Sequence, residues 1–198
     1  AMYPYDNPIP ADNNQSAIGD CCLIAFMATL SYCAPDYIKH IIKENGQGYE
    51  VTMYDPKGKA ITVGVNKEMI HNLTGDTLPG CKSKENTACW SSILEKATMK
   101  YLQIFPYCKN LRGIPTDIAA AIFTGDGEGF WFWPESGLTG PECKKVVTVL
   151  LKKGWGVIGG FQKGEIKVDD VTKSLTGHAY SFFFPQKQDA LFCMRNPW

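Results

Sequence analysis

The sequence predicts an α+β protein with a helical N-terminal half and a β-rich C-terminal half. Residues 21–30 are apolar on every side, which is typical of a helix buried in a core. Residues 88–97 repeat apolar side chains at helical spacing and predict a second long helix. The last third contains three strand-like runs instead, at 156–161, 178–184 and 190–195. We therefore expect a helical part followed by a β part.

Shorter elements are predicted between these segments. Residues 49–54 and 60–65 are strand-like and are joined by Asp-Pro-Lys-Gly at 55–58, a turn signal that predicts a hairpin. The remaining predicted helices are 36–43, 116–123 and 141–154.

The chain of 198 residues is long enough for one large domain or for two small ones that share an interface. Residues 110–115 interrupt the predicted elements with turn-forming residues. We place a boundary there, with a helical subdomain over 1–112 and a β-rich subdomain over 113–198.

The composition is that of an ordinary globular protein, with 44% hydrophobic and 20% charged residues. Because 20 basic residues balance 20 acidic ones, the charge does not favour binding to nucleic acid or to an anionic membrane. The first residues lack a signal-peptide pattern, and the longest apolar stretch is too short to span a bilayer. We expect a cytoplasmic protein, with a secreted effector as the alternative, and the oligomeric state stays open.

Eight cysteines are more than average for this length. Cys21 and Cys22 are adjacent and no C-x-x-C pair exists, so the cysteine spacing does not favour a zinc ribbon. A chain of this size does not need a disulfide scaffold, so we expect most of the thiols to be reduced.

Three of the residue types that carry thiol catalysis occur in the order cysteine, histidine, asparagine. Cys21 begins the buried helix, where the partial positive charge of a helix N-terminus stabilises a thiolate. His178 would supply the neighbouring imidazole, and Asn196 would accept from that ring and hold its tautomer. Gln15, six residues before Cys21, is placed to donate its amide to the oxygen that becomes negative during attack on a carbonyl.

The strands at 178–184 and 190–195 flank a turn-like stretch at 185–189. A simple hairpin centred on Lys187 would put His178 opposite Asn196, with both side chains on one face. Each of these residues alone has a commoner structural explanation, and only the joint pattern favours catalysis.

At this point the sequence resembles the protease core of the calpains. Residues 15–26, Gln-Ser-Ala-Ile-Gly-Asp-Cys-Cys-Leu-Ile-Ala-Phe, are similar to the family's Gln-Gly-x-Leu-Gly-Asp-Cys-Trp-Leu-Leu-Ala-Ala. The family's Gly-His-Ala-Tyr-Ser and Arg-Asn-Pro-Trp recur at 177–181 and 195–198. Trp-Ser-Ser-Ile-Leu-Glu-Lys-Ala at 90–97 and Phe-Thr-Gly at 123–125 agree as well. The resemblance covers nearly the whole chain.

The resemblance implies a papain-like fold of two subdomains with the active site in the cleft between them. It implies cleavage of protein or peptide substrates at a limited number of sites. Cys21 would be the nucleophile, His178 the base and acid, Asn196 the orienting residue and Gln15 the oxyanion donor. Gly113 and Gly177 match glycines that bind the substrate backbone. The chain departs from the family at Cys22, where the tryptophan after the nucleophile is expected.

Calpain cores bind two calcium ions, and the resemblance would make calcium the cofactor. Asp12 matches an acidic ligand of the first site, but Ala88 stands where a second acidic ligand is expected. The carboxylates of the second site would lie beyond Trp198. Because calcium takes six to eight oxygen ligands, we expect no metal and no other cofactor.

Two other functions use the same residues. A peptide ligase or acyl transferase would pass the acyl group from the thioester to an amine instead of water. A catalytically silent binding module would keep the fold without the chemistry, although intact Cys21, His178, Asn196 and Gln15 argue against it.

Overall fold

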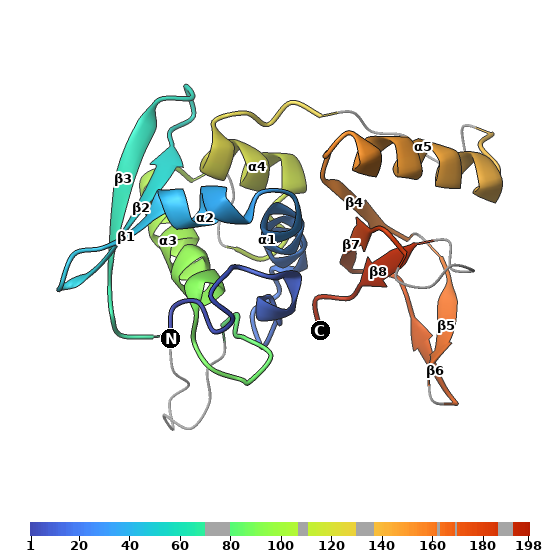
Figure 1. Cartoon of the computed structure of the whole chain (residues 1–198), viewed down its shortest axis with the longest axis horizontal. Helices are drawn as coiled ribbons and strands as arrows, with labels where there is room; N and C mark the ends of the chain where they lie inside the picture. Colours follow the sequence, from blue (N-terminus) through green and yellow to red (C-terminus); the bar gives the residue numbers. More distant parts are fainter. Residues whose placement is uncertain (70–79, 107–110, 130–136, 162, 169, 186–191) are drawn as a thin grey trace.

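The computed structural model describes residues 1–69, 80–106, 111–129, 137–161, 163–168, 170–185 and 192–198. It is an α+β structure, as the sequence predicts. Helix α1 (Cys21–Cys33) lies in the middle of the molecule, with α2 (Pro35–Ile41), α3 (Trp90–Ile104) and α4 (Thr116–Thr124) on one side (Figure 1). The expected helix over 21–30 is therefore confirmed, and its side chains from Leu23 to Thr29 are all buried.

A three-stranded antiparallel sheet covers the outer side of these helices. Its order is β1 (Ile42–Glu44), β2 (Gly48–Tyr54), β3 (Ala60–Asn66), and β2 and β3 form the predicted hairpin. The helix expected over 36–43 ends at Ile41, and Ile42–Glu44 form β1 instead, a strand too short to show an alternating pattern.

The main hydrophobic core joins α1 to α3, α4 and this sheet. The apolar face expected for α3, at Trp90, Ile93, Leu94 and Ala97, is fully buried in it. Ala119, Ile122 and Phe123 of α4 belong to the same core, although the boundary expected after residue 112 assigned them to the β-rich part. The core clusters alone do not divide a chain into domains, and that boundary stays a prediction.

The rest of the chain forms a second layer of structure beside α1. Helix α5 (Gly140–Lys152) packs on a sheet of order β4 (Val157–Gly160), β7 (Ala179–Phe183), β8 (Cys193–Arg195) around a small core of Val147, Leu151 and Val157. A separate hairpin of β5 (Glu165–Val168) and β6 (Val171–Ser174) projects away from this sheet (Figure 1). A 3-10 turn, η1 (Pro10–Asp12), precedes the cysteine segment.

Strand β7 is attached directly to the central helix. Ser181 Oγ donates to the carbonyl oxygen of Ala25 at 2.8 Å, in a fully buried contact. Gly156, just before β4, approaches α1 so closely that a Cβ there would lie 2.5 Å from Thr29 Cγ2. These contacts pack β7 and the residue before β4 against α1.

The register of β7 and β8 differs from the expected one by two residues. The observed pairs are Ser181↔Arg195, Phe182↔Met194 and Phe183↔Cys193. Continued to the start of β7, this register puts His178 opposite Trp198, so the prediction that Asn196 faces His178 directly is wrong. The connection at 186–191 lies outside the described residues.

In the described part of the chain the cysteines are free thiols: Cys21, Cys22, Cys33, Cys81, Cys89, Cys143 and Cys193. Among the described residues no single helix is both long and apolar enough to cross a membrane, and α1 with α2 passes that test only as a pair bent by 111°.

Candidate active site

Cys21 is the first residue of α1 and is partly exposed, whereas the rest of that helix is largely buried. The N–H groups of a first helical turn have no partner within the helix, so they surround Cys21 with partial positive charge. Asp20, the N-cap residue, makes no side-chain hydrogen bond to cap the helix. The sequence therefore leaves this helix N-terminus open to a thiolate.

The surroundings lower the pKa of Cys21 to about 5. The largest cause is a hydrogen bond from the Cys22 thiol, and burial acts against it. The backbone N–H of Ala179 and the side chain of His178 lower the pKa further. Cys22 shows the opposite change, with a raised pKa, because it stays protonated beside the Cys21 sulfur. We assign the thiolate to Cys21, since that sulfur has three stabilising partners.

His178 immediately precedes β7 and follows Gly177, whose backbone has a φ of +79°. That conformation favours glycine and turns the chain just before the histidine. The ring of His178 interacts with Cys21, as expected. Its Nδ1 accepts a hydrogen bond from Trp198 Nε1 at 3.0 Å.

Asn196 is the residue directly after β8. It is not hydrogen-bonded to His178 among the described contacts. Its Oδ1 accepts instead from the backbone N–H of Trp198 at 3.1 Å. The structure thus brings Cys21 and His178 together, and Trp198 rather than Asn196 is hydrogen-bonded to the imidazole.

Gln15 is buried, with 7% of its surface exposed. Its Nε2 donates to the carbonyl oxygen of Ile18 at 2.6 Å, within the loop that leads to Cys21, and its Oε1 has no hydrogen-bond partner. Because a primary amide has two N–H donors, one of them has no partner among the described contacts.

The two glycines expected to bind substrate lie on either side of this group. The N–H of Gly113 donates to the carbonyl oxygen of Gly19 at 3.3 Å, which attaches Gly113 to the nucleophile loop. Its φ is +73°, and a Cβ at Gly113 or at Gly177 would find open space. Both backbones are therefore accessible to another chain.

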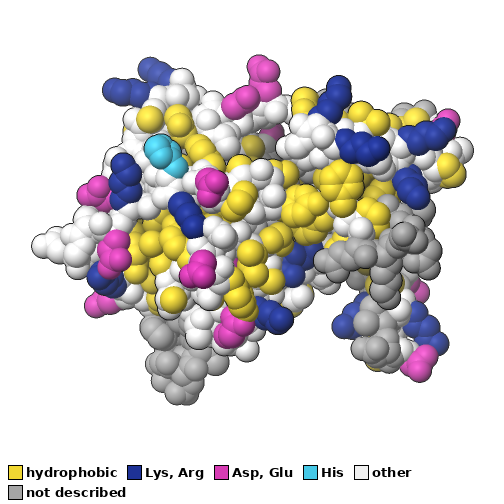
Figure 2. All heavy atoms as spheres, viewed as in Figure 1, with side chains coloured by type: hydrophobic (Ala, Val, Ile, Leu, Met, Phe, Trp, Pro, Cys, Tyr) yellow, Lys and Arg dark blue, Asp and Glu magenta, His cyan; other side chains and the backbone are white. Residues whose placement is uncertain are grey.

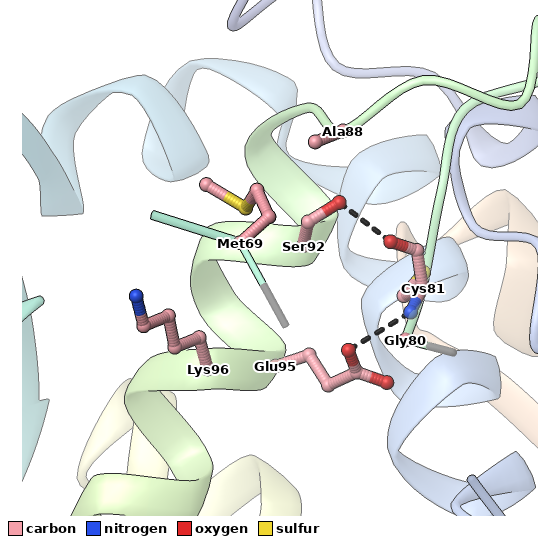
Figure 3. Close-up of a pocket in the computed structure, with 7 residues that line it drawn as sticks. All are labelled: Met69, Gly80, Cys81, Ala88, Ser92, Glu95 and Lys96. Carbon is pink, nitrogen blue, oxygen red and sulfur yellow. Dashed lines mark hydrogen bonds between the residues drawn. The ribbon is translucent and has the colours of Figure 1, made fainter. Parts of the chain in front are cut away.

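Two buried carboxyl groups lie next to each other near the nucleophile. Asp20 directly precedes Cys21, and Glu95 belongs to α3. Asp20 and Glu95 are 1% and 2% exposed. Burial, and then the neighbouring Glu95, raise the pKa of Asp20 to about 9. Both Asp20 oxygens lack a hydrogen-bond donor, while Glu95 Oε2 accepts from the backbone N–H of Cys81 at 2.8 Å (Figure 3). Burial and the neighbouring carboxyl therefore both favour the protonated form of Asp20.

In the described part of the chain, Asp12, which was expected at the first calcium site, is engaged in other contacts. Asp12 is fully buried, and its Oδ2 accepts from Trp90 Nε1 at 2.7 Å and from the backbone N–H of Ile9 at 3.2 Å. Ala88 offers no side-chain oxygen (Figure 3). No group of three or more His, Cys, Asp or Glu side chains with metal-binding geometry occurs among the described residues. A single available carboxylate oxygen, Asp12 Oδ1, does not fit the ligand demand of calcium.

A cavity of about 310 Å³ lies between the two layers, further along α1 from Cys21. Figure 2 shows hydrophobic side chains gathered across the middle of this face of the molecule. The cavity is lined from α1 by Phe26 and Thr29, from α4 by Thr116 and Asp117, and from the opposite side by Trp155 and Ile158.

Sequence reasoning missed three features of the site. The contact of Trp198 with His178 and the carboxyl pair of Asp20 and Glu95 depend on tertiary packing. Arg195 bonds to the segment before Gln15 from the other end of the chain. The one signal available beforehand was that these residues stand inside the motifs quoted above.

An α+β fold that brings a helix-borne cysteine to a histidine from a neighbouring sheet is characteristic of thiol proteases. A family model described as calpain family cysteine protease matches residues 2–198, so this chain belongs to the calpain family of cysteine proteases. The resemblance found in the sequence is therefore confirmed, and the chain is a hydrolase of the thiol protease class. A search of curated proteins found no match.

Proposed function

We propose that the protein is a thiol endopeptidase that cleaves protein substrates at limited sites. The observation that carries this proposal is the position of Cys21, at the N-terminus of α1 and in contact with His178 and the N–H of Ala179. The helix N-terminus, His178 and the N–H of Ala179 all favour the thiolate, which is the reactive form of a cysteine.

In the proposed reaction the Cys21 thiolate attacks the carbonyl carbon of the scissile peptide bond. The carbonyl oxygen becomes negative and accepts from the free N–H of Gln15. Protonated His178 then gives its proton to the departing amine, and the carbon–nitrogen bond breaks to leave a thioester on Cys21. His178 next removes a proton from water, whose oxygen attacks the thioester and regenerates the thiolate.

The proposal includes a papain-like arrangement of two subdomains with a cleft between them. The cavity bounded by Phe26, Thr29 and Trp155, and the two open glycine backbones at 113 and 177, support it. An extended substrate would pass Gly113 on one side and Gly177 on the other, so that its scissile bond reaches Cys21.

The orienting role of Asn196 requires a rearrangement. Asn196 Oδ1 must release the Trp198 N–H, and the indole of Trp198 must leave His178 Nδ1, before the asparagine can accept from the imidazole. We infer that the described arrangement is a resting state, and that substrate binding brings the asparagine into place.

We propose further that catalysis does not need calcium or another cofactor. The occupied Oδ2 of Asp12 and the missing oxygen at Ala88 support this, and the reaction above uses only side chains of the chain itself.

A ligase or acyl transferase would share every step up to the thioester. An amine would then replace water as the second nucleophile. Incubation of the protein with a peptide and excess glycine amide, followed by mass spectrometry of the products, separates the two: hydrolysis gives free carboxylates and transfer gives the new amide.

The decisive test is to compare Cys21→Ala with Cys143→Ala, which removes a partly exposed thiol on α5. Fluorescein-labelled casein serves as the protein substrate and an epoxide as the thiol label. We expect the wild type and Cys143→Ala to cleave casein and to be labelled at Cys21, and Cys21→Ala to do neither while melting at the wild-type temperature. Activity in Cys21→Ala, or label on Cys22, would show that the nucleophile is wrongly assigned. A wild-type protein that is not labelled and does not cleave would support the silent binding module.

A further inference from the structure

The segment that leads to the nucleophile meets the C-terminal segment beside the site. The backbone N–H of Gln15 donates to the carbonyl oxygen of Pro197 at 2.7 Å. The residue proposed as oxyanion donor and the residue after Asn196 are therefore joined directly, although most of the chain separates them. Figure 1 shows the C-terminus lying against the N-terminal segment.

Arg195, the last residue of β8, makes the other contacts of this junction. Its Nη2 donates to the carbonyl oxygen of Asn13 at 3.1 Å and to Oδ1 of Asn14 at 2.9 Å. A guanidinium bonded to two oxygens of neighbouring residues holds their backbone in one orientation, because its donors are fixed in a plane.

Asn14 has a second set of contacts, with Ala11 and Lys82. Its Nδ2 donates to the carbonyl oxygens of Ala11 at 2.9 Å and Lys82 at 3.2 Å. Its backbone also exchanges two hydrogen bonds with Lys82, at 3.0 Å and 3.1 Å. The segment 13–15 thus lies between residue 82 on one side and the segment 195–197 on the other.

Hydrogen bonds do little to fix the position of the Gln15 side chain. It makes one hydrogen bond, to Ile18, and its buried Oε1 has no partner. The place of its amide relative to Cys21 therefore depends on the backbone of 13–15, which Arg195 holds.

We propose that Arg195 is the positioning residue of the oxyanion donor: by binding Asn13 and Asn14 it sets the distance between the Gln15 amide and the nucleophile. This inference rests on the proposed function, since it assumes that Gln15 stabilises an oxyanion formed by attack of Cys21.

The nucleophile is held by separate contacts. Strand β7 is fixed to α1 by Ser181 and Ala25, and the partners of Cys21 are Cys22, Ala179 and His178. Loss of Arg195 should therefore harm the steps that form an oxyanion and spare the reactivity of the thiolate.

The experiment compares Arg195→Met, which keeps the aliphatic stem without donors, with Arg195→Lys, which keeps the charge. Asn14→Ala removes the acceptor from the other side, and Lys84→Met is the matched control for loss of an exposed positive charge nearby. Each variant is assayed for kcat/KM of casein-derived peptide hydrolysis, for the rate of Cys21 alkylation by iodoacetamide, and for its melting temperature. Alkylation displaces iodide at the sulfur and forms no oxyanion, so it reports the thiolate alone.

We expect Arg195→Met to lower kcat/KM by on the order of 10-fold to 100-fold, mainly through kcat, because small displacements of a catalytic group have effects of this size. Its alkylation rate should stay within about threefold of the wild type, because the Arg195 contacts described above are with Asn13 and Asn14, and residues that share no partner couple weakly. Asn14→Ala should have a similar effect, the double variant should lose no more than either single one, and Arg195→Lys should recover part of the loss.

Hydrolysis at the wild-type rate in Arg195→Met, or a parallel loss of hydrolysis and alkylation, would overturn the inference and leave the proposed function standing. If Arg195→Met does not fold, Asn14→Ala and Arg195→Lys decide in the same way. A wild-type protein whose Cys21 is neither alkylated nor active would overturn the proposed function, and the inference with it.

Discussion

Trp198 Nε1 donates a hydrogen bond to Nδ1 of His178 at 3.0 Å, and the two rings meet nearly at right angles. Because an indole N–H can only donate, Nδ1 carries a lone pair in this arrangement, and the proton of the neutral imidazole is on Nε2. The imidazolium of a thiolate–imidazolium pair has protons on both nitrogens. The contact with Trp198 therefore has to break before His178 can carry a proton on Nδ1, which the reactive pair with Cys21 requires.

Replacement of Trp198 by phenylalanine removes this donor and keeps an aromatic ring. We expect the iodoacetamide reaction of Cys21 to become about threefold to tenfold faster at pH 6.5, the range that one hydrogen bond of 0.5–1.5 kcal/mol allows. The second-order rate, measured by mass spectrometry of the labelled peptide, checks this. An unchanged or slower reaction would mean that the indole contact does not restrain the histidine.

A second prediction concerns Cys22, the largest cause of the low pKa of Cys21. Cys22→Ala removes the thiol donor and should raise the pKa of Cys21 above about 5, so that the rise of alkylation with pH occurs at higher pH than in the wild type. Cys22→Ser keeps a donor and is the matched control, which should behave like the wild type. Identical pH profiles for the alanine and serine variants would show that position 22 does not tune the nucleophile.

The third prediction follows from the raised pKa of Asp20. Burial, and then the neighbouring Glu95, raise the pKa of Asp20 from 3.8 in the unfolded chain to about 9 in the folded protein. Between these limits the folded state binds one proton more, so this group stabilises the fold fully at low pH and progressively less as the pH rises. The Asp20→Asn variant has no titrating group at this position, so its stability should not decrease with pH for this reason.

Urea unfolding at pH 5, 6.5 and 8 measures the effect. The difference in the free energy of unfolding, Asp20→Asn minus wild type, should increase with rising pH, by at most about 1.4 kcal/mol per pH unit. The comparison with the wild type is needed because the lowered pKa of Cys21 acts in the opposite direction: it stabilises the fold above the unfolded thiol pKa and loses this effect as the pH falls toward 5. Parallel curves for the two proteins would contradict a raised pKa of Asp20 in the folded protein.

Gly113 supplies the fourth prediction. Gly113→Ala should cost about 1 kcal/mol of stability, because an alanine at its φ of +73° adopts the left-handed region. If a substrate backbone lies against Gly113, the added methyl group also raises KM for peptide hydrolysis. Gly46→Ala is the matched control, since Gly46 has a φ of +81° and equally open space but lies in the hairpin of β1 and β2. Equal KM values for the two variants would remove Gly113 from the substrate site.

The fifth prediction is that proteolytic activity survives excess EDTA. Asp12 and Ala88 together offer too few oxygens for a strong calcium site, so chelation should leave casein cleavage and the melting temperature unchanged. Loss of activity on chelation, restored by added calcium, would show that other oxygens of the chain bind the ion.

Local patterns were sufficient for most elements of the fold. Helix α1 could be predicted because its residues are apolar all round, and the hairpin of β2 and β3 because a strong turn signal separates two strand-like runs. Strand β6 has every residue exposed, so it lacks the buried face that produces an alternating pattern. The hairpin that contains it could not be predicted for that reason.

The sequence by itself determined which residues are candidates for chemistry, because the motifs around Cys21, His178 and Asn196 are contiguous and each is complete within a few residues. Only the tertiary structure decided which of them touch. A shift of two residues between β7 and β8 leaves every side chain on the same face, so the hydrophobic pattern cannot distinguish the two registers. That shift places Trp198 rather than Asn196 against His178, and packing between distant segments likewise joins Arg195 to Asn14.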